Sequence, residues 1–508
     1  MLYQHKGHNG LNRATWQYIG LILIGMGLVQ YIPLITSVIY SEWDMALNFL
    51  ISSSAALFVG GLVALMGKKS EHQKLGWNQG MVVAAGSWFL GMLLCALPHY
   101  LSGNYLSYLD SCFDVMSGLT TTGLVMIQDM DHLSNGLNMW RHLLTFIGGQ
   151  GIVVLALSFL VKGTSGAYKM YVGEGKDERL MPNVVSTARY IWLISLIYLV
   201  VGTLVLWIAG MIAGLSAERA ILHGLWVFMS AWSTGGFAPM SQSILYYHNT
   251  FYEIATMVFF IIGSFNFALH YAVLTGRRRE LVRNVETVSF MVTVTVLTLI
   301  TTLGLMRLNV YPDLAAMFRK GFYQLISGHT TTGFMTVYAK QFYQEWGDIA
   351  LFGIIIAMLF GASACSTAGG FKGLRIGIIA HTLKREVKRM ALPDSTICVE
   401  KYHHIKDAVL DDNLIRSAFL IVMAYVVTFA AGTLAGMLSG YPFGMAAFES
   451  ASVTGNVGLS IGVTSAAMPS ALKVIYIVIM WLARLEFMSV FALVVYLAGK
   501  VKKKCSAL

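Results

Sequence analysis

Charged residues, proline and paired cysteines are all scarce in this sequence. Only 12% of its 508 residues are charged, whereas soluble domains carry about 25%. Eight prolines are too few for a chain dominated by coil, and five scattered cysteines without a CxxC pair indicate neither a disulfide framework nor a zinc site. HExxH, Walker A and GxGxxG motifs in a strand–helix context are missing as well, so we do not expect this chain to bind or hydrolyse ATP.

Apolar residues are abundant instead. They make up 56% of the chain, which also holds 50 glycines, and the mean hydropathy is +0.65. Apolar runs of about 20 residues recur from end to end, which predicts an all-α polytopic membrane protein and excludes almost any cytosolic enzyme. We place ten candidate spans at 15–40, 45–67, 81–101, 142–161, 190–214, 251–275, 287–309, 347–381, 415–438 and 471–499.

Four shorter stretches rich in Gly, Thr and Ser lie between some of these spans. They are too short and too polar to cross a bilayer, so we expect re-entrant loops, which membranes tolerate only where irregular backbone is buried in protein or lines a water-filled cavity. The four stretches are 105–124, 220–237, 316–334 and 443–459.

The placement of basic residues sets the orientation. Six segments on one side of this layout hold 27 of the 35 Lys and Arg: 1–14, 68–76, 162–189, 276–284, 372–416 and 500–508. The positive-inside rule predicts that these segments and both termini are cytoplasmic, with the four semi-polar stretches outside. Because the basic residues are divided among six loops, the net charge of +10 is a sign of topology and we expect no nucleic-acid binding.

One pattern recurs once in each semi-polar stretch: an aromatic residue, three residues, Ser, five residues, Gly. Composition alone predicts roughly half a match in a chain of this length. The four copies are Phe113–Ser117–Gly123, Trp226–Ser230–Gly236, Tyr323–Ser327–Gly333 and Phe448–Ser452–Gly458. Two spans separate successive copies, so the repeats share one orientation and are parallel. Close helix packing through small residues is the alternative explanation, but packing does not require the same spacing four times on one face.

Each copy ends in a tetrad that could bind a cation. A short helix from the aromatic through the Ser would end at the tetrad and direct its negative pole into the membrane. The tetrad glycines permit extended backbone, and four such stretches around an axis would form rings of carbonyl oxygens that replace the hydration shell of a monovalent cation. The tetrads are Thr120-Thr121-Thr122-Gly123, Ser233-Thr234-Gly235-Gly236, Thr330-Thr331-Thr332-Gly333 and Gly455-Asn456-Val457-Gly458.

A gate is predicted below the tetrads. The stretch 361–373 interrupts a span of more than 30 residues with small and polar residues, so its helix is expected to be irregular. Arg484 lies within the last span, where an Arg costs about 2.5–3.5 kcal/mol and usually faces the interior. We expect the loop to obstruct the pore and Arg484 to hold it and add a positive barrier; the alternative for Arg484 is a structural pair with Glu486 or loop carbonyls. The predicted gate residues, besides Arg484, are Gly361, Ala362, Ser363, Ala364, Cys365, Ser366, Thr367, Ala368, Gly369, Gly370 and Lys372. Lys372 and Arg375 are also expected to anchor the inner membrane edge.

Other polar residues leave two interpretations open. The acidic side chains of the outer stretches could attract cations to the mouth or merely cap loop helices; they are Asp110, Asp114 and Glu449. His329 is expected to be a structural side chain, with pH sensing as the alternative. His403 and His404 lie in a charged cytosolic loop, where solvation or a partner contact is favoured over metal binding.

With these features, the whole chain resembles the superfamily of K⁺ transporters that includes bacterial Trk and Ktr membrane subunits and plant HKT transporters. Three motifs resemble family motifs: GGQGIVVLAL after Trp140-Arg141, GASACSTAGGFKGLR at 361–375, and MWLARLE at 480–486. Two extra N-terminal spans and the TTTG of the first loop favour the Trk-type branch, that of TrkH and TrkG. The fourth tetrad departs from the Gly-Thr-Val-Gly expected there, and the second is unusual too.

The resemblance implies K⁺ uptake across the bacterial cytoplasmic membrane through the four tetrads, whose key residues are all Gly. It implies no cofactor beyond K⁺ ions in the pore, a homodimer, and a cytosolic nucleotide-binding regulatory ring of TrkA type. It also implies four membrane–pore-loop–membrane repeats around a central pore after a two-helix extension. We place the extension at 1–76 and the repeats at 77–175, 176–284, 285–400 and 401–508.

Two other classes compete with a K⁺ pore. A membrane enzyme would use Ser, Thr, His and Asp of the loops, but it needs one distinctive active loop with a nucleophile and a base. An inverted-repeat secondary transporter is disfavoured by the parallel repeats. Whether K⁺ passes through a gated channel or is coupled to H⁺ or Na⁺ stays open from sequence alone.

Overall fold

The computed structural model describes residues 13–67, 75–159, 167–176, 183–393 and 398–505, with the side chains of 159 and 499–505 outside this description. It is mostly helical, with one short antiparallel hairpin. This confirms the all-α class. The predicted cytoplasmic ends 1–12 and 506–508 and much of 68–76 and 162–189 lie outside the described residues.

Local sequence explains many helix starts. Ser107, Ser134 and Ser216 each accept a hydrogen bond from a backbone N–H in the first turn of the helix that they precede, and Asn183 and Asn249 do the same. Such side chains satisfy backbone donors that have no partner inside the helix. The residues between the caps are strongly apolar, which suits a bilayer. A helix pairs its backbone groups internally, and the bilayer requires this because it offers them no water.

The first half of the chain holds the N-terminal extension and the first two predicted repeats. Its helices are α1 (Arg13–Val29), α2 (Tyr31–Ile39), α3 (Trp43–Gly67), α4 (Trp77–Cys95), α5 (Leu97–Leu101), α6 (Tyr108–Leu119), α7 (Asn135–Gln150), α8 (Ile152–Phe159), α9 (Ala167–Gly173), α10 (Val184–Ile212), α11 (Ala217–Trp232), the 3-10 helix η2 (Ser243–Tyr247), α12 (Thr250–Gly263) and α13 (Phe267–Leu274).

The second half holds the other two predicted repeats and the hairpin. Its elements are α14 (Glu280–Arg283), α15 (Val285–Arg307), α16 (Leu314–Met317), the π-helix η3 (Phe318–Phe322), α17 (Tyr323–His329), α18 (Ala339–Glu345), α19 (Gly347–Phe360), α20 (Gly373–Met390), β1 (Lys401–His404), β2 (Lys406–Val409), α21 (Asp412–Leu438), α22 (Phe443–Gly455), α23 (Ser470–Arg484) and α24 (Met488–Cys505).

Among the described residues, six helices are long and apolar enough to cross a membrane, or up to nine if each of three bent pairs counts as one span. The bent pairs are α7–α8, α12–α13 and α23–α24, with angles of 80°, 99° and 114°. The predicted span 347–381 begins with α19, an apolar helix of 14 residues. The number of ten spans therefore stays a prediction.

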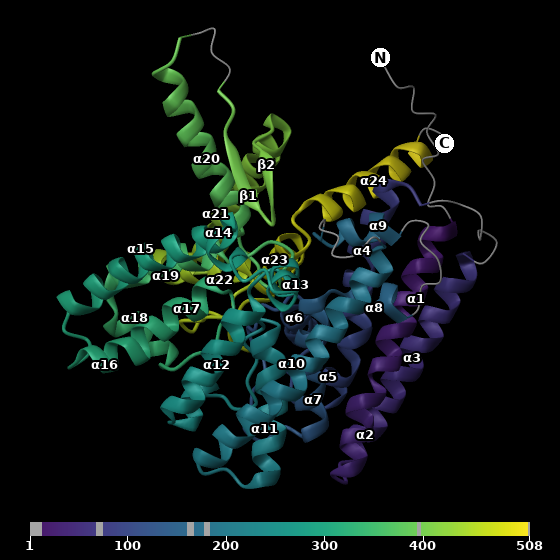
Figure 1. The fold of residues 1–508 in the computed structure, drawn as a ribbon. Coiled ribbons are helices and arrows are strands. Elements are labelled where there is room, and N and C mark those ends of the chain that lie inside the picture. The colour runs from purple at the N-terminus through teal and green to yellow at the C-terminus, as the bar shows by residue number, and fades with distance from the viewer. Residues whose placement is uncertain (1–12, 68–74, 160–166, 177–182, 394–397, 506–508) are drawn as a thin grey trace.

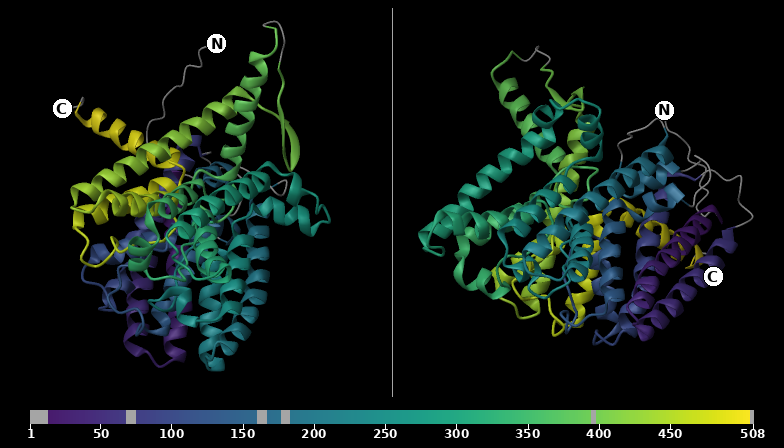
Figure 2. Two further views of the ribbon diagram at one scale, coloured as in Figure 1. Left: turned by 90° about the vertical axis from the view of Figure 1, so that its left-hand side faces the viewer. Right: turned by 60° about the horizontal axis from the view of Figure 1, so that its bottom comes forward.

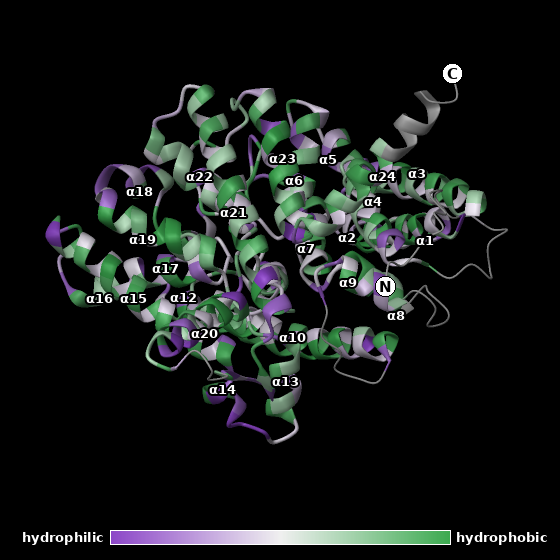
Figure 3. Ribbon diagram, turned by 90° about the horizontal axis from the view of Figure 1, so that it is seen from above, coloured by the Kyte–Doolittle hydropathy of each residue, from purple (hydrophilic) through white to green (hydrophobic). Residues whose placement is uncertain are grey.

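The long helices leave large apolar side chains on the outside of the molecule. Phe58, Leu303 and Val427 are each more than 60% exposed, and hydrophobic residues dominate the helices around the rim (Figure 3). Extensive apolar surface of this kind is rare on soluble monomers and suits contact with lipid.

The long helices run roughly side by side, while α20 and the β1–β2 hairpin project beyond them at one end (Figures 1 and 2). The start of α1 and the end of α24 lie at that same end (Figure 1). The hairpin pairs Lys401 with Val409 and His404 with Lys406. Two basic side chains of α20 attach the chain just before the hairpin: Lys384 and Lys388 both pair with Glu400.

The helix that follows each tetrad breaks at one fixed distance from the tetrad glycine. Counting 28 residues on from Gly123, Gly236, Gly333 and Gly458 gives Gly151, Ser264, Gly361 and Glu486. The first three directly follow α7, α12 and α19, and Glu486 lies between α23 and α24. All four breaks thus fall at the same step of the repeat pattern.

Candidate ion pathway

The helices that lead to the tetrads end where the sequence predicts. Helices α6, α11 and α17 end at the residue before the tetrad, and α22 ends at the first tetrad residue, Gly455. Their starts differ from the prediction: α6 and α22 begin five residues before the aromatic and α11 begins nine before it. For α6 and α11 the N-caps explain the earlier start, since Ser107 and Ser216 begin these two helices further outward.

The four tetrads fold into the same turn. The second tetrad residue has a positive φ in every copy: Thr121 (56°), Thr234 (50°), Thr331 (56°) and Asn456 (52°). The third residue donates its backbone N–H to the carbonyl of the motif Ser at 2.7–2.8 Å, in Thr122, Gly235, Thr332 and Val457. The repeated Ser is therefore a position in a repeated backbone turn.

The tetrad glycines form a closed ring. A Cβ built on Gly123 would lie 2.6 Å from the carbonyl oxygen of Gly235. In the same way, a Cβ on Gly236 would meet Thr332 O, one on Gly333 would meet Val457 O, and one on Gly458 would meet Thr122 O, all more closely still. Each glycine also has a positive φ, between 68° and 100°. Every contact thus joins one loop to the next, the last joins the fourth to the first, and no side chain fits at any of the four positions.

The four glycines also line one cavity. It has a volume of about 140 Å³ and is bounded on its other sides by the outer loops, through residues such as Met130, Ser241 and Met335. The described geometry therefore brings four stretches, separated by about a hundred residues each, around a single opening.

A polar acceptor supports the loop after the tetrad in three of the four copies. In these copies, the side chain of the residue three positions before the motif Ser accepts a hydrogen bond. The donor is the backbone N–H of the residue three positions after the tetrad glycine. Asp114 accepts from Met126, Gln324 from Thr336 and Glu449 from Ile461, at 3.2–3.3 Å. This signal is visible in sequence as the residue after the aromatic, and our sequence analysis missed it. The carboxylates of Asp114 and Glu449 are fully buried and hydrogen-bonded to these loops, which favours the structural interpretation of the two residues over attraction of cations at the mouth. Asp110 is likewise buried and pairs with Lys473 at 2.5 Å.

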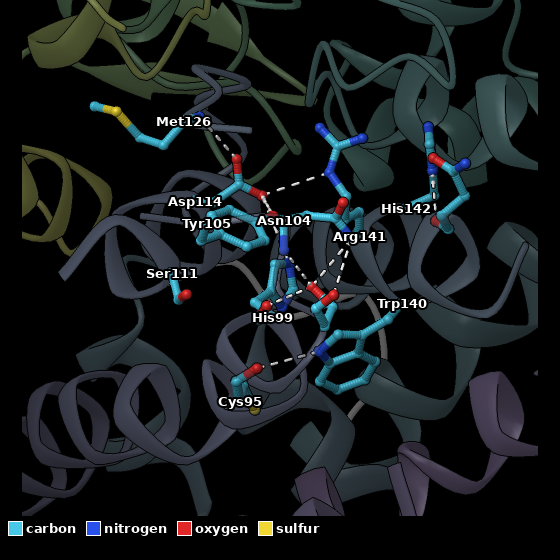
Figure 4. Close-up of polar contacts among 12 residues, drawn as sticks. Cys95, His99, Asn104, Tyr105, Ser111, Asp114, Met126, Trp140, Arg141 and His142 are labelled. Atoms are coloured by element: carbon cyan, nitrogen blue, oxygen red, sulfur yellow. Dashed lines mark hydrogen bonds and ion pairs between the residues drawn. The ribbon is translucent and has the colours of Figure 1, made fainter. Parts of the chain in front are cut away.

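The second copy has Val227 at this position, and Arg141 of α7 supports its loop instead. Arg141 Cζ lies 4.5 Å from the centroid of Phe237, and its Nη1 is 3.5 Å from Ala238 O. Asp114 neutralises this buried guanidinium at 3.4 Å and also accepts from Tyr105 at 2.9 Å, while His99 Nε2 lies 3.5 Å away (Figure 4). The network thus connects the first loop to the second.

Residues 361–372 are irregular between α19 and α20, which confirms the predicted interruption of this helix. The loop lies against the inner side of the tetrads. Thr367 Oγ1 lies 3.2 Å from Thr234 Oγ1, and Gly369 N donates to Thr331 Oγ1 at 2.8 Å. Ser363 N donates to Ser264 O at the break between α12 and α13. Cys365 and Lys372 adopt positive φ, and the loop residues are buried.

Arg484 links this loop to the first copy. Its guanidinium donates to Thr367 O at 2.7 Å, Thr121 Oγ1 at 3.2 Å, Gly148 O at 2.7 Å and Gly149 O at 3.2 Å. Its partners are thus one carbonyl of the intramembrane loop, two carbonyls at the end of α7 and one tetrad hydroxyl. Glu486 is engaged elsewhere: Lys372 Nζ lies 2.7 Å from its Oε1 and Arg375 also pairs with it. Together, the loop and Arg484 contact the second tetrad residue of the first three copies.

The three histidines considered in the sequence, His329, His403 and His404, each contact other side chains of the protein. His329 Nε2 lies 2.8 Å from Thr293 Oγ1, and its ring packs edge-on against Phe290. His403 contacts Glu280 and Asp407, and His404 Nδ1 lies 3.3 Å from Asn284 Oδ1. Within the described part of the chain, no group of three His, Cys, Asp or Glu could hold a metal ion.

Comparisons with known proteins place this geometry in a family. A family model for TrkH, described as a cation transport protein, matches residues 46–501. An uncharacterised cation transporter of Methanocaldococcus jannaschii is 30% identical over 478 residues, covering 94% of each chain. The Trk system potassium uptake proteins TrkG and TrkH of Escherichia coli K12 are 28% and 29% identical, covering 95% of this chain and 97% and 98% of theirs.

The fold is also that of a solved relative. The crystal structure of the potassium transporter TrkH from Vibrio parahaemolyticus superposes with a TM-score of 0.79 at 24% identity, covering 95% of this chain and 98% of that one. The family consists of cation transporters and not of enzymes, which agrees with the predicted class. This chain therefore belongs to the TrkH family of cation transport proteins, within the Trk superfamily, and is a membrane protein with many apolar helices.

Proposed function

We propose that this chain carries K⁺ across the membrane through the opening between the four tetrads. The observation that carries the proposal is the closed ring of Gly123, Gly236, Gly333 and Gly458, in which each backbone lies against a carbonyl of the next copy. A narrow opening bounded by backbone at four equivalent places suits a dehydrated monovalent cation. The relatives named as potassium uptake proteins support K⁺ as that cation.

In this proposal the tetrads are the selectivity filter. Three of the four helices that lead to them end at the residue before the tetrad and the fourth at its first residue, so that the negative poles of their dipoles face the same space. The rigid geometry supports selectivity because the side chains behind the tetrads are buried and hydrogen-bonded: Thr120 Oγ1 lies 2.7 Å from Thr122 Oγ1, and Thr330 and Thr332 make the same contact at 2.8 Å.

The loop 361–373 and Arg484 are the proposed gate. Buried loop residues lie directly below three tetrads, and Arg484 holds them by hydrogen bonds while placing a positive charge beside the path. Moving the loop away requires these bonds to break. A cytosolic nucleotide-binding ring and a homodimer are further proposals that rest on the family, with α20 and the hairpin as the projecting cytosolic surface and both chain ends on that side.

A transporter that couples K⁺ to H⁺ or Na⁺ is the second candidate. Buried carboxylates favour it in general, because a proton pathway needs titratable groups. Here Asp114 and Glu449 are held by loop donors outside the ring, which favours the uncoupled pore.

The test is cation flux through purified protein in liposomes under an imposed potential, with K⁺, Rb⁺ and Na⁺ compared. Gly123→Ser should lose K⁺ selectivity, because a Cβ would collide with Gly235 O. Gly103→Ser is the matched control: Gly103 also has a positive φ, of 74°, but has open space around it. Equal Na⁺ and K⁺ flux in the wild type would overturn K⁺ selectivity. Absence of any flux, even with the nucleotide-binding partner added, would overturn the pore.

A further inference from the structure

A short segment between the first and second repeats enters the space below the intramembrane loop. It follows α9 and consists of Glu174, Gly175 and Lys176. Helix α9 is docked on α4, where the backbones of Gly173 and Gly80 touch. Ser489 of α24 donates to Gly173 O. The segment is thus attached to the first and fourth repeats before it turns inward.

Glu174 anchors the segment. Its carboxylate accepts from Val153 N at 2.9 Å, Val154 N at 3.2 Å and Trp88 Nε1 at 3.2 Å. The two valines form the first turn of α8, where the helix dipole favours a negative charge. The carboxylate occupies the bend at Gly151, since a Cβ there would meet its oxygens. Glu174 is therefore held in place at the break of the first repeat.

Lys176 follows from this anchor into a buried position. It is 4% exposed, and its Nζ lies 5.2 Å from the ring centroid of Phe267, the first residue after the break of the second repeat. Next to it, a Cβ on Gly175 would lie 3.3 Å from Glu486 Cγ, at the break of the fourth repeat. The groups whose fields reach Lys176 are Glu174, Arg484, Lys372 and the thiol of Cys365 in the intramembrane loop.

The Lys176 ammonium has no hydrogen-bond or ion-pair partner among the described residues. Glu174, two residues before Lys176, is engaged by three other donors. A buried cation without a partner is costly and is rarely kept for packing alone. Its neighbours come from the breaks of all four repeats, which are the elements that surround the path below the tetrads.

We propose that Lys176 is a tethered cation that obstructs the inner half of the ion path, below Arg484 and the intramembrane loop. This inference rests on the proposed K⁺ pore. The ammonium carries the same charge as a permeating K⁺, and in a space with little water the two repel each other strongly. Conduction then requires the segment 174–176 to move outward together with the opening of the loop, so Lys176 is a second barrier in series with the first.

The test compares K⁺ flux into liposomes for the wild type, Lys176→Gln and Lys176→Arg. Lys169→Gln is the matched control, because Lys169 lies on α9 and also faces an aromatic ring, Trp77, at 5.9 Å, but donates to Leu75 O away from the loop. We expect Lys176→Gln to raise K⁺ flux roughly tenfold, which is about 1.4 kcal/mol of barrier. Lys176→Arg and Lys169→Gln should behave as the wild type, and the K⁺/Na⁺ ratio should not change.

Charge rescue separates a barrier from a structural role. In Lys176→Cys, an aminoethyl methanethiosulfonate reagent restores a positive charge through a disulfide, and it should lower the raised flux, whereas a neutral methyl reagent should not. The wild type with the same reagents controls for the native cysteines. Flux of Lys176→Gln equal to the wild type, or an equal rise in Lys176→Arg, would overturn the barrier. If Arg484→Ala raises flux and Lys176→Gln does not, only this inference fails; if no variant passes any cation with the partner present, the pore proposal fails with it.

Discussion

Asn456 Nδ2 donates a hydrogen bond of 3.0 Å to Thr122 Oγ1, and so joins the fourth tetrad to the first. The same amide donates to Met480 O of α23 at 3.1 Å. This is the contact at which the ring closes between copies that are 334 residues apart. The φ of 52° at Asn456 suits asparagine, which adopts this region more readily than most residues. The departure of the fourth tetrad from the expected threonine thus has a structural explanation.

Asn456→Thr should keep the backbone turn, because three threonines adopt it in the other tetrads. It should lose one or both of the amide's hydrogen bonds and lower stability by about 1–3 kcal/mol, since Met480 O and Thr122 Oγ1 are buried. We expect a lower K⁺/Na⁺ flux ratio and a lower unfolding temperature in detergent. Asn104→Thr is the control, because the amide of Asn104, among the described residues, bonds only to Ser102. An unchanged K⁺/Na⁺ ratio in Asn456→Thr would show that the contact between Asn456 and Thr122 does not set selectivity.

Arg484→Ala should raise K⁺ flux through the purified chain alone in liposomes, without the proposed nucleotide-binding partner. The change removes four donated bonds, two of which hold Thr367 O and Thr121 Oγ1 together below the ring, and it removes a buried positive charge. A rise of roughly tenfold corresponds to about 1.4 kcal/mol of barrier. Arg189→Ala is the control, because Arg189 is exposed and, among the residues that the structure describes, donates only to Ser158 O. Flux equal to the wild type would refute both the holding and the barrier role.

The sequence predicts those features of this site that depend on a single repeat. The spacing of aromatic, Ser and Gly predicts where α6, α11 and α17 end, and small residues predict the interruption at 361–373. What it leaves out are contacts between repeats. Three of the four groups to which Arg484 donates are carbonyls, of Thr367, Gly148 and Gly149, which any residue type provides, so sequence carries no sign of these three. They depend on how the copies are ordered around the axis.

Other features could have been found from sequence. The acceptor after the aromatic is acidic or amide in three copies, as Asp114, Gln324 and Glu449. The exception is Val227, which cannot accept a hydrogen bond, so the second loop needs support from another side chain; in the structure this is Arg141. Lys176 gave no signal, because a lysine in a basic segment reads as a cytosolic charge until the fold buries it.

Asp114→Asn should destabilise the protein more than Glu449→Gln, although both remove a buried charge from the same repeat position. Asp114 neutralises Arg141, so its loss leaves a buried guanidinium unpaired, which typically costs about 3–5 kcal/mol. Glu449 accepts only from neutral donors among its described contacts, on Ser460, Ile461 and Thr464. Thermal unfolding of both variants in the same detergent measures the difference. Equal losses would mean that Arg141 finds another partner and that the network does not depend on charge.

The β1–β2 hairpin should be held against α14 in a pH-dependent way. His403 Nε2 lies 2.8 Å from Glu280 Oε2 and its Nδ1 lies 2.6 Å from Asp407 Oδ1. Hydrogen bonds to Asp407 and then Glu280 raise the pKa of His403 above 6.5, despite an opposing effect of Arg283. Only the imidazolium can donate to both carboxylates. The stabilisation is therefore complete below the unfolded pKa and is lost as pH rises through the raised folded value.

The attachment of the hairpin to α20 should not change over the same range. Hydrogen bonds from Lys384 and Lys388 lower the pKa of Glu400 to about 2. This carboxylate therefore stays ionised until the pH falls towards 2, and its stabilising effect is complete at every pH above its ordinary pKa of 4.5. Hydrogen exchange of residues 401–409, corrected for intrinsic rates, should show weaker protection at about pH 9 than at about pH 6. His403→Gln should remove that difference while the amides of α20 stay protected alike at both pH values. A pH dependence that persists in His403→Gln would assign it to another group and refute the role of this histidine.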